Sequence, residues 1–239
     1  MNAIFIDSEF MNYEIKGNSL PVVICRLDAN ETILSESGAM GWMSDNIVMD
    51  TNIKGGIFKG IARAFSGESV FLNTFTSKVN NGLIAFPSSF PGKIVAKQLY
   101  ANEYIICQKG SFLAGDSSIS VDAFFKKKLG AGFFGGEGFI LQKITGPGMV
   151  FLELDGHVEE YDLSPGEVMK VDTGNVAAFE SSVNFDVETV KGMKNVFFGG
   201  EGLFLTVLTG PGKIYLQTMP IQNLAGEISR YFNTGGSNS

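Results

Sequence analysis

Three glutamates in glycine-rich segments are the first candidates for chemistry. Glu137 and Glu201 each stand in the sequence Phe-Phe-Gly-Gly-Glu-Gly, and Glu68 stands in a looser copy, Ala-Phe-Ser-Gly-Glu-Ser. A glycine-rich phosphate loop normally opens a helix, and its Walker form carries Gly-Lys followed by Ser or Thr. Here apolar residues typical of strands follow the glycines, and no such lysine is present. We interpret each segment as a tight bend whose glutamate accepts backbone hydrogen bonds or lies exposed.

The alternative is a binding site formed by Glu68, Glu137 and Glu201 if pseudo-symmetry brings them together. Three carboxylates could bind a cation. However, calcium takes roughly six to eight oxygen ligands, and magnesium requires a near-octahedral set. The dense aspartate run of a calcium loop is missing from the sequence. We therefore expect no metal and no cofactor, and we keep the three glutamates as possible binding or turn-stabilising residues.

The residues that could support catalysis form no recognisable set. His157 is the sole histidine, beside the turn Asp155-Gly156, and no nucleophile elbow accompanies it. Cys25 and Cys107 lie in apolar segments, with only one basic neighbour each, whereas an activated thiolate needs a nearby cation or base. We expect an exposed histidine and two buried free thiols in a reducing compartment. No catalytic residue is assigned, and the prediction is a protein that is not an enzyme.

The charge balance argues against nucleic acid as a partner. The formal net charge is −7 and the isoelectric point is about 4.8, whereas nucleic-acid binding needs a basic face. The only basic run, Lys126-Lys127-Lys128, is interpreted as a solvated turn, with a phosphate or anionic-lipid contact as the alternative. We expect no secretory signal, because the first residues lack a basic start and a long apolar run, and no apolar run approaches the roughly 18 residues of a membrane span. The predicted location is the cytoplasm.

The candidate glutamates are positioned by an internal repeat. Glu137 and Glu201 are each preceded by a glycine at 27 residues and followed by a Thr-Gly-Pro-Gly segment whose proline lies 10 residues on. In the first copy, Pro91 is matched to these prolines, which leaves about 13 additional residues after Glu68. We expect these residues to form a hairpin at Asn80-Asn81-Gly82, and Asp155-Gly156 to form another.

The elements around this repeat are strands. Apolar and polar residues alternate in segments such as 119–123 and 150–154, as in half-buried β-strands. The prediction is an all-β fold with a β module at 1–100 that includes a lead-in, a second at 101–163 and a third at 164–220. A single module of roughly 65 residues would bury only about 60% of its surface, so the modules should share a core. Apolar residues at helical spacing indicate a short amphipathic helix within 221–239, followed by a tail: Ile221, Leu224, Ile228 and Tyr231.

The glycine–glutamate segments, the Thr-Gly-Pro-Gly turns and their threefold recurrence resemble a bacterial family of uncharacterised proteins. That family is related to the mitochondrial biogenesis "altered inheritance of mitochondria" (AIM) proteins. The resemblance covers roughly Pro21 to Pro220. It implies three short double-stranded β-helix modules of β-sandwich type, like those of the tryptophan RNA-binding attenuation protein. It also implies a homotrimer that forms a ring of nine modules, and it supplies no catalytic residues.

Two functions from different classes follow. The first is a non-enzymatic, ring-forming scaffold or interaction protein, with an obligate interface on the order of 2,000 Å² or more. The physical reason is that small β modules leave open sheet edges, which self-association closes. The second is a small-molecule binding module with sites between the β modules. An enzyme or an RNA-binding protein is the less favoured interpretation.

Overall fold

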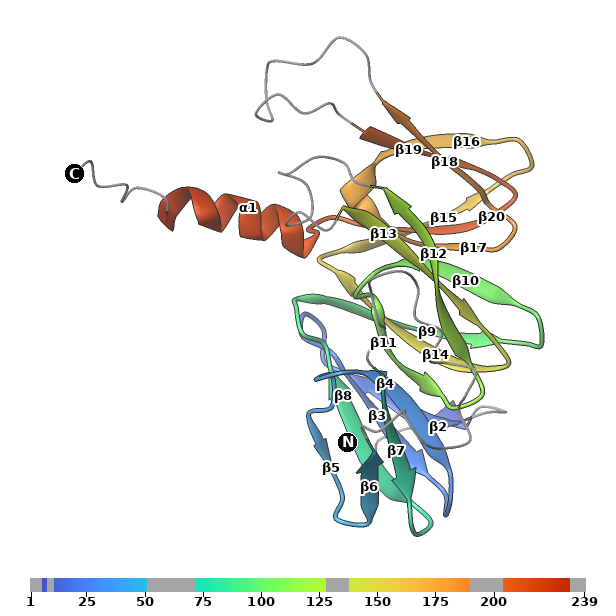
Figure 1. The fold of residues 1–239 in the computed structure, drawn as a ribbon, viewed down its shortest axis with the longest axis vertical. Coiled ribbons are helices and arrows are strands. Elements are labelled where there is room, and N and C mark those ends of the chain that lie inside the picture. The colour runs from blue at the N-terminus through green and yellow to red at the C-terminus, as the bar shows by residue number, and fades with distance from the viewer. Residues whose placement is uncertain (1–5, 8–10, 51–71, 128–137, 190–203, 233–239) are drawn as a thin grey trace.

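A computed structural model describes residues 6–7, 11–50, 72–127, 138–189 and 204–232. The described residues form a nearly all-β molecule with one short C-terminal helix, as predicted. Figure 1 shows the strands stacked along the long axis, with the N-terminal strands at one end and the C-terminal strands at the other. The remainder of the chain is not described.

The described strands belong to four antiparallel sheets. The first has the order β1 (Ile6–Asp7), β2 (Asn12–Lys16), β3 (Val22–Leu27), β8 (Gly82–Pro87), β5 (Trp42–Met43). The second has the order β6 (Ile47–Asp50), β7 (Leu72–Ser77), β4 (Thr32–Glu36), β11 (Phe112–Asp116), β14 (Gly148–Asp155), β9 (Gly92–Leu99). The third has the order β12 (Ser120–Lys127), β13 (Phe139–Thr145), β10 (Tyr104–Gln108), β17 (Val176–Glu180), β20 (Gly212–Gln217), β15 (Val158–Leu163). The fourth has the order β16 (Val168–Asp172), β19 (Phe204–Thr209), β18 (Asn184–Thr189).

The pairing relations recur along the chain at an interval of six strands. β7 lies between β6 and β4, β13 between β12 and β10, and β19 between β18 and β16. Likewise β8 lies between β5 and β3, β14 between β11 and β9, and β20 between β17 and β15. We call the recurring groups β3 to β8, β9 to β14 and β15 to β20 strand sets. Two further pairs, β4–β11 and β10–β17, link one strand set to the next. The module limits given above stay a prediction.

The turns differ from the sequence-based expectation in the first copy. Thr76 and Thr145 are equivalent in the pairing, and so are Gly82 and Gly148, so the turn at 77–81 corresponds to the Gly146-Pro147 turn. The match of Pro91 to Pro147 is therefore wrong, because residues 77–81 already occupy the place of that turn. The sequence comparison relied on the proline alone, whereas the first copy turns through Asn81 at a φ of 60°.

Neither predicted hairpin forms. The chain does turn at Asn80-Asn81-Gly82 and at Asp155-Gly156, but the strands on either side belong to different sheets. β7 and β8 each pair with other strands, and so do β14 and β15. A turn signal marks where the chain reverses, and it does not determine which strands then exchange hydrogen bonds.

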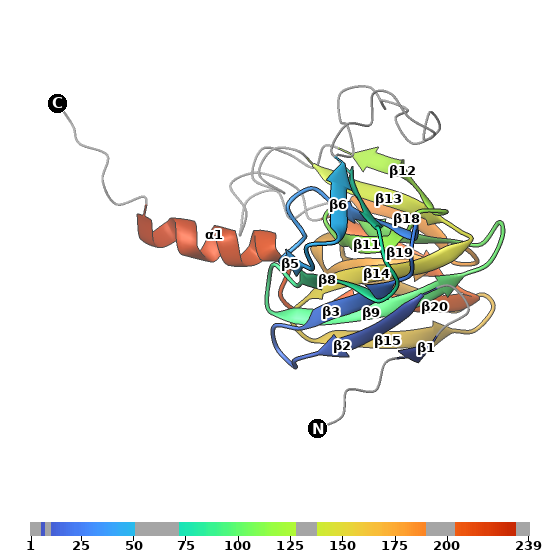
Figure 2. The ribbon, with the colours of Figure 1, turned by 90° about the horizontal axis from the view of Figure 1, so that it is seen from below.

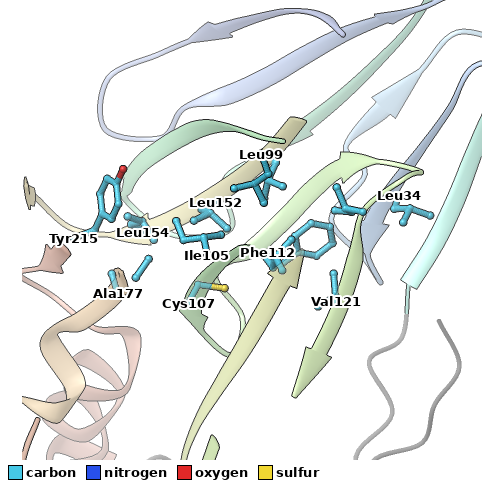
Figure 3. Close-up of a cluster of buried hydrophobic side chains, with 14 of the residues drawn as sticks. Leu34, Leu99, Ile105, Cys107, Phe112, Val121, Leu152, Leu154, Ala177 and Tyr215 are labelled. Atoms are coloured by element: carbon cyan, nitrogen blue, oxygen red, sulfur yellow. The ribbon is translucent and has the colours of Figure 1, made fainter. Parts of the chain in front are cut away.

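The buried apolar side chains of the described residues form three clusters. One apolar cluster takes residues from strands far apart in sequence, from Leu34 through Phe112 and Leu152 to Tyr215. Figure 3 shows this cluster filling the space between the sheets. Strands with sheet neighbours on both sides are mostly buried, as in β14, whereas the edge strand β15 is exposed along its middle. Burial of apolar surface stabilises a fold by roughly 25 cal/mol per Å², so these buried apolar side chains are the main source of stability.

Helix α1 (Ile221–Phe232) follows Pro220 and confirms the predicted C-terminal helix. It projects from the strands in both views (Figures 1 and 2). Its first residue is held to the body, because the backbone N–H of Ile221 donates a 2.8 Å hydrogen bond to Asp155 Oδ2. Ile228 and Tyr231 are exposed on the helix.

Candidate functional site

The three predicted glutamates cannot be placed. Glu68, Glu137 and Glu201 lie outside the described residues, so their convergence stays a prediction. The same holds for Lys128 and for the side chains of Lys126 and Lys127 at the end of β12. Within the described ranges, no group of three His, Cys, Asp or Glu side chains is arranged to hold a metal ion.

The other residues considered for catalysis lie in the positions expected. The His157 side chain is 71% exposed and its Nε2 lies 2.9 Å from Glu159 Oε1. Cys25 and Cys107 are free and fully buried. Burial raises the pKa of both thiols, and a carboxylate raises it further in each case: Glu31 for Cys25 and Glu36 for Cys107. Both are therefore neutral core side chains rather than nucleophiles.

A polar cleft of about 350 Å³ lies where β4 and β10 end and α1 begins. A smaller hollow of about 160 Å³ shares part of its lining. Both strands leave the sheet through the same turn, in which Gly38 and Gly110 have φ values of 87° and 88°. Only glycine adopts this conformation without strain. The side chains used below are Glu36, Gln108, Lys109, Glu153, Asp155 and Gln217.

Two of these side chains form a closed amide pair. Gln108 and Gln217 are 4% and 3% exposed, and Gln217 Nε2 donates to Gln108 Oε1 at 2.8 Å and to the Gly174 carbonyl at 3.1 Å. Gln217 Oε1 in turn accepts the Asp155 N–H at 3.1 Å. These bonds satisfy the Gln217 side chain, as a buried amide requires.

The equivalent positions one strand set earlier hold two acids. Glu36 ends β4 as Gln108 ends β10, and Glu153 of β14 corresponds to Gln217 of β20. Glu153 accepts the Ser89 N–H at 2.7 Å and the Ser88 hydroxyl at 3.1 Å. In the described part of the chain the Glu36 carboxylate has no such bond, and it faces the cleft.

The electrostatics of the cleft follow from this arrangement. Burial raises the pKa of Glu36, the Glu153 carboxylate raises it further, and Lys109 partly offsets both effects. Burial also raises the pKa of Asp155, against the hydrogen bond from the Ile221 N–H. A carboxyl group that is costly to ionise can take a proton or a hydrogen-bond donor from a ligand. At Glu36 the cleft therefore presents a carboxyl group that is protonated more readily than an exposed one.

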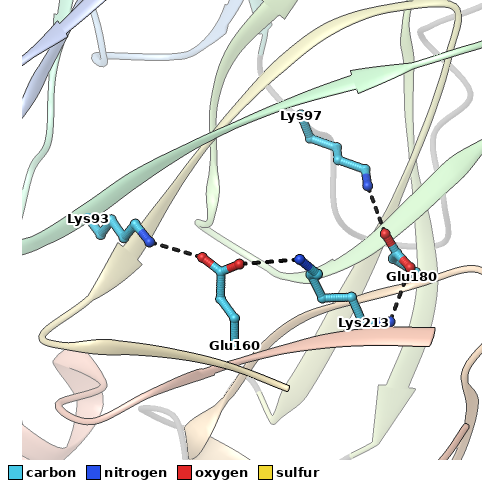
Figure 4. Close-up of polar contacts among 5 residues, drawn as sticks. All are labelled: Lys93, Lys97, Glu160, Glu180 and Lys213. Carbon is cyan, nitrogen blue, oxygen red and sulfur yellow. Dashed lines mark hydrogen bonds and ion pairs between the residues drawn. The ribbon is translucent and has the colours of Figure 1, made fainter. Parts of the chain in front are cut away.

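A row of ion pairs connects β9, β15, β17 and β20 (Figure 4). Lys97 Nζ lies 2.7 Å from Glu180 Oε1, and Lys93 Nζ lies 2.9 Å from Glu160 Oε1. Lys213 approaches Glu160 at 3.6 Å, and its backbone N–H donates to Glu180. Burial alone would raise the pKa of Glu180, but the bonds from Lys97 and Lys213 outweigh burial and hold the pKa below its usual range.

Sequence reasoning missed the Glu36–Glu153 and Gln108–Gln217 pairs. One usable signal was present, because Glu36 and Gln108 each stand two residues before a repeated glycine, Gly38 and Gly110. The partners across the sheets, Glu153 and Gln217, carried no such mark.

The fold places the protein in the all-β class, with successive strand sets that share sheets. Within this class, the chain belongs to the family described as Mitochondrial biogenesis AIM24, whose model matches residues 13–219. An uncharacterized protein of Streptococcus pyogenes serotype M6 is 28% identical over 230 residues, covering 93% of this chain and 91% of that protein. The crystal structure of protein SPYM3_0169 from Streptococcus pyogenes has a TM-score of 0.74 and 27% identity, covering 92% of this chain and 99% of that one. Among the described helices, none has the length and apolar character to cross a bilayer.

Proposed function

We propose that this protein is a non-enzymatic scaffold whose copies join head to tail into a homotrimeric ring, located in the cytoplasm. The supporting observation is that the two ends of the chain carry the separate halves of a sheet that occurs whole inside it. The prediction of a ring with three copies comes from the family resemblance. The unpaired sheet edges give a physical reason why the copies would associate.

Each complete six-stranded sheet combines strands from two successive sets. In the second sheet, β6, β7 and β4 come first and β11, β14 and β9 complete the order. In the third sheet, β12, β13 and β10 are completed by β17, β20 and β15. The fourth sheet, β18-β19-β16, is the first half alone, and β5-β8-β3 of the first sheet is the second half alone. The fourth sheet therefore lacks the second half, which β5-β8-β3 could supply, and the first sheet lacks the first half, which β18-β19-β16 could supply.

The two half-sheets cannot complete each other within one chain. β5 and β16 lie at opposite ends of the long axis (Figure 1). Among the described strands, β5 and β16 each end a sheet without a partner on their outer side. An unpaired edge favours association with another strand, and unlike complementary ends generate a ring when the rotation closes. Three strand sets per chain would then give a ring of nine.

The test is the mass of the intact protein in solution across a wide concentration range, measured by light scattering and native mass spectrometry. The expected mass is three times the chain mass of 25.7 kDa. A monomer at micromolar concentration would contradict the assembly. Turnover by the pure protein in a broad substrate screen, abolished by changes in the cleft, would contradict the non-enzymatic part.

The second candidate is a small-molecule binding module with its site between strand sets. The observation that favours it is the Glu36 carboxylate, which faces the cleft without a hydrogen-bond partner in the described residues. Thermal-shift measurements with amino acids, nucleotides and small amines provide the test. A ligand of the cleft would raise the melting temperature of the natural protein but not of Glu36→Gln, and the exposed Glu188→Gln would serve as control. No shift with any of these compounds would argue against this function.

A further inference from the structure

We infer that β16 of one copy pairs with β5 of the next in a single antiparallel register, with Val171 opposite Trp42 and Lys170 opposite Met43. This inference rests on the proposed head-to-tail assembly and specifies the surface that forms it. The partner is a second copy of this chain.

The register follows from the two internal links between strand sets. In β4–β11, Ser35 lies opposite Ala114, and in β10–β17, Cys107 lies opposite Ala178. The pairings within the sets make Ser35 and Cys107 equivalent to Val171, and Ala114 and Ala178 equivalent to Trp42. Applied once more, the same link places Val171 opposite Trp42. The antiparallel direction then places Lys170 opposite Met43.

Burial at the position of Trp42 supports a covered surface, whereas its proposed partner Val171 is already 8% exposed in the isolated chain. The four internal residues Ser35, Cys107, Ala114 and Ala178 are all 0% exposed. By contrast, Trp42 is 48% exposed in the isolated chain. The position of Trp42 is therefore buried at both internal links, where it holds Ala114 and Ala178. At the unpaired edge of β5 the same position is exposed and holds the sole tryptophan of the chain. Tryptophan is the residue type most enriched among those that dominate binding energy at protein interfaces.

The surfaces around the two edges fit the same pairing. Val168, at the start of β16, is 54% exposed. On β16 the exposed Lys170 is paired with Glu188 of its own copy, at 2.6 Å. Its charge is therefore already balanced, and its aliphatic stem can lie along Met43.

The test is a disulfide between the two edges in the full-length chain. Residues directly opposite in an antiparallel pair have Cα atoms about 4.5–5.5 Å apart, which lies within the range for a disulfide. The double variant Met43→Cys/Lys170→Cys should give covalent dimers and trimers under mild oxidation. The matched control Met43→Cys/Val168→Cys moves one cysteine two residues along β16, about 7 Å away, and should crosslink at least about tenfold more slowly. The natural Cys25 and Cys107 are fully buried, so the unaltered protein should give little background.

The single variants test the head-to-tail direction. Met43→Cys alone and Lys170→Cys alone should stay uncrosslinked, because β5 meets β16 and never another β5. Efficient crosslinking of either single variant would overturn the inference by showing a two-fold contact. Equal rates for the Lys170 and Val168 pairs would also overturn it.

Trp42 supplies a second readout that does not depend on cysteine. Tryptophan fluorescence should shift to the blue as the concentration rises through assembly. Trp42→Ala should raise the concentration for half-assembly by at least about tenfold, whereas Leu20→Ala, another exposed apolar residue at 61%, should leave it unchanged. A natural protein that stays monomeric overturns the scaffold proposal itself. Only this register is overturned if the protein is a trimer, Trp42→Ala leaves the mass and the concentration for half-assembly unchanged, and the Met43→Cys/Lys170→Cys variant does not crosslink.

Discussion

The two links between strand sets have the same backbone pairing but different polar chemistry. At the first, β4 against β11, Glu36 and Glu153 face the cleft as two acids. At the second, β10 against β17, Gln108 and Gln217 close into a bonded amide pair. Among the described residues, the ion pairs of Figure 4 belong to the second link. Three of their residues have apolar counterparts at the first link, because Cys25, Ala96 and Met149 occupy the positions of Lys97, Glu160 and Lys213. Glu180 corresponds to an acid, Asp116, which therefore has no lysine at the position of Lys97.

This difference shows that the register does not depend on the polar side chains. Both links keep the same order of strands, and both β11 and β17 carry an irregularity in pairing two residues after the repeated glycine. The backbone ladder and the buried apolar side chains are what the links share. Polar residues are then free to tune stability and its pH dependence at each link separately.

The largest effect should come from breaking the amide pair. Gln217→Leu removes two donated bonds and one accepted bond, and it takes these partners from the buried Gln108 Oε1 and from the partly buried Asp155 N–H. We expect a loss of about 2–3 kcal/mol in the free energy of unfolding, measured by urea titration at fixed protein concentration. Glu153→Leu, the same change at the first link, should cost less, since its partners Ser88 and Ser89 are less buried. Equal losses would mean that the two links are equivalent in energy.

The next effect should come from the best of the ion pairs. Glu180→Gln should lower stability at pH 7 by about 1 kcal/mol, because the carboxylate bonded to Lys97 is lost. The folded-state pKa of Glu180 lies below its ordinary value of 4.5. Its stabilising contribution is therefore present above about pH 4.5 and is lost as the pH falls through the folded-state value. The curves of the natural and variant proteins should converge in acid, and a constant gap down to pH 3 would contradict the assignment.

The acid pair at the first link should respond with the opposite sign. Burial and Glu153 raise the folded-state pKa of Glu36 above 4.5, so folding favours the protonated carboxyl. That contribution is complete below about pH 4.5 and is lost as the pH rises through the folded-state value. Glu36→Gln should therefore be more stable than the natural protein at pH 7 by about 0.5–1 kcal/mol. Urea titrations from pH 4 to pH 8 would measure this, and a destabilised variant at pH 7 would mean that the charge is needed.

The smallest effect should come from the exposed ion pair. Lys93 and Glu160 are 51% and 34% exposed, and Lys213 also approaches Glu160. Lys93→Met should change stability by no more than about 0.5 kcal/mol, with no difference left in 1 M salt. A larger effect that persists in high salt would indicate a packing role for the lysine stem.

Much of the fold could be predicted from local sequence, whereas the site could not. Alternation, the repeated glycines and the C-terminal apolar spacing indicated the strands, two of the matching turns and helix α1. The match of Pro91 failed because the first copy replaces a Gly-Pro turn with an asparagine turn. Both hairpins failed because the strands after each turn pair across sheets. The acid pair and the amide pair each join residues more than 100 positions apart, and only the three-dimensional pairing brings them together.

The unlike edges at the two ends of the chain have a consequence for polymer form. In a head-to-tail assembly, the interface fixes only the rotation angle between neighbouring subunits. That angle decides whether the subunits close into a ring or continue as a fibre. The rotation angle from one subunit to the next includes the small angles between strand sets at the links inside each chain. In the proposed assembly, changes at Glu36 or Gln217, which lie at the internal links, would alter how many copies close, or convert closed particles into filaments visible by electron microscopy.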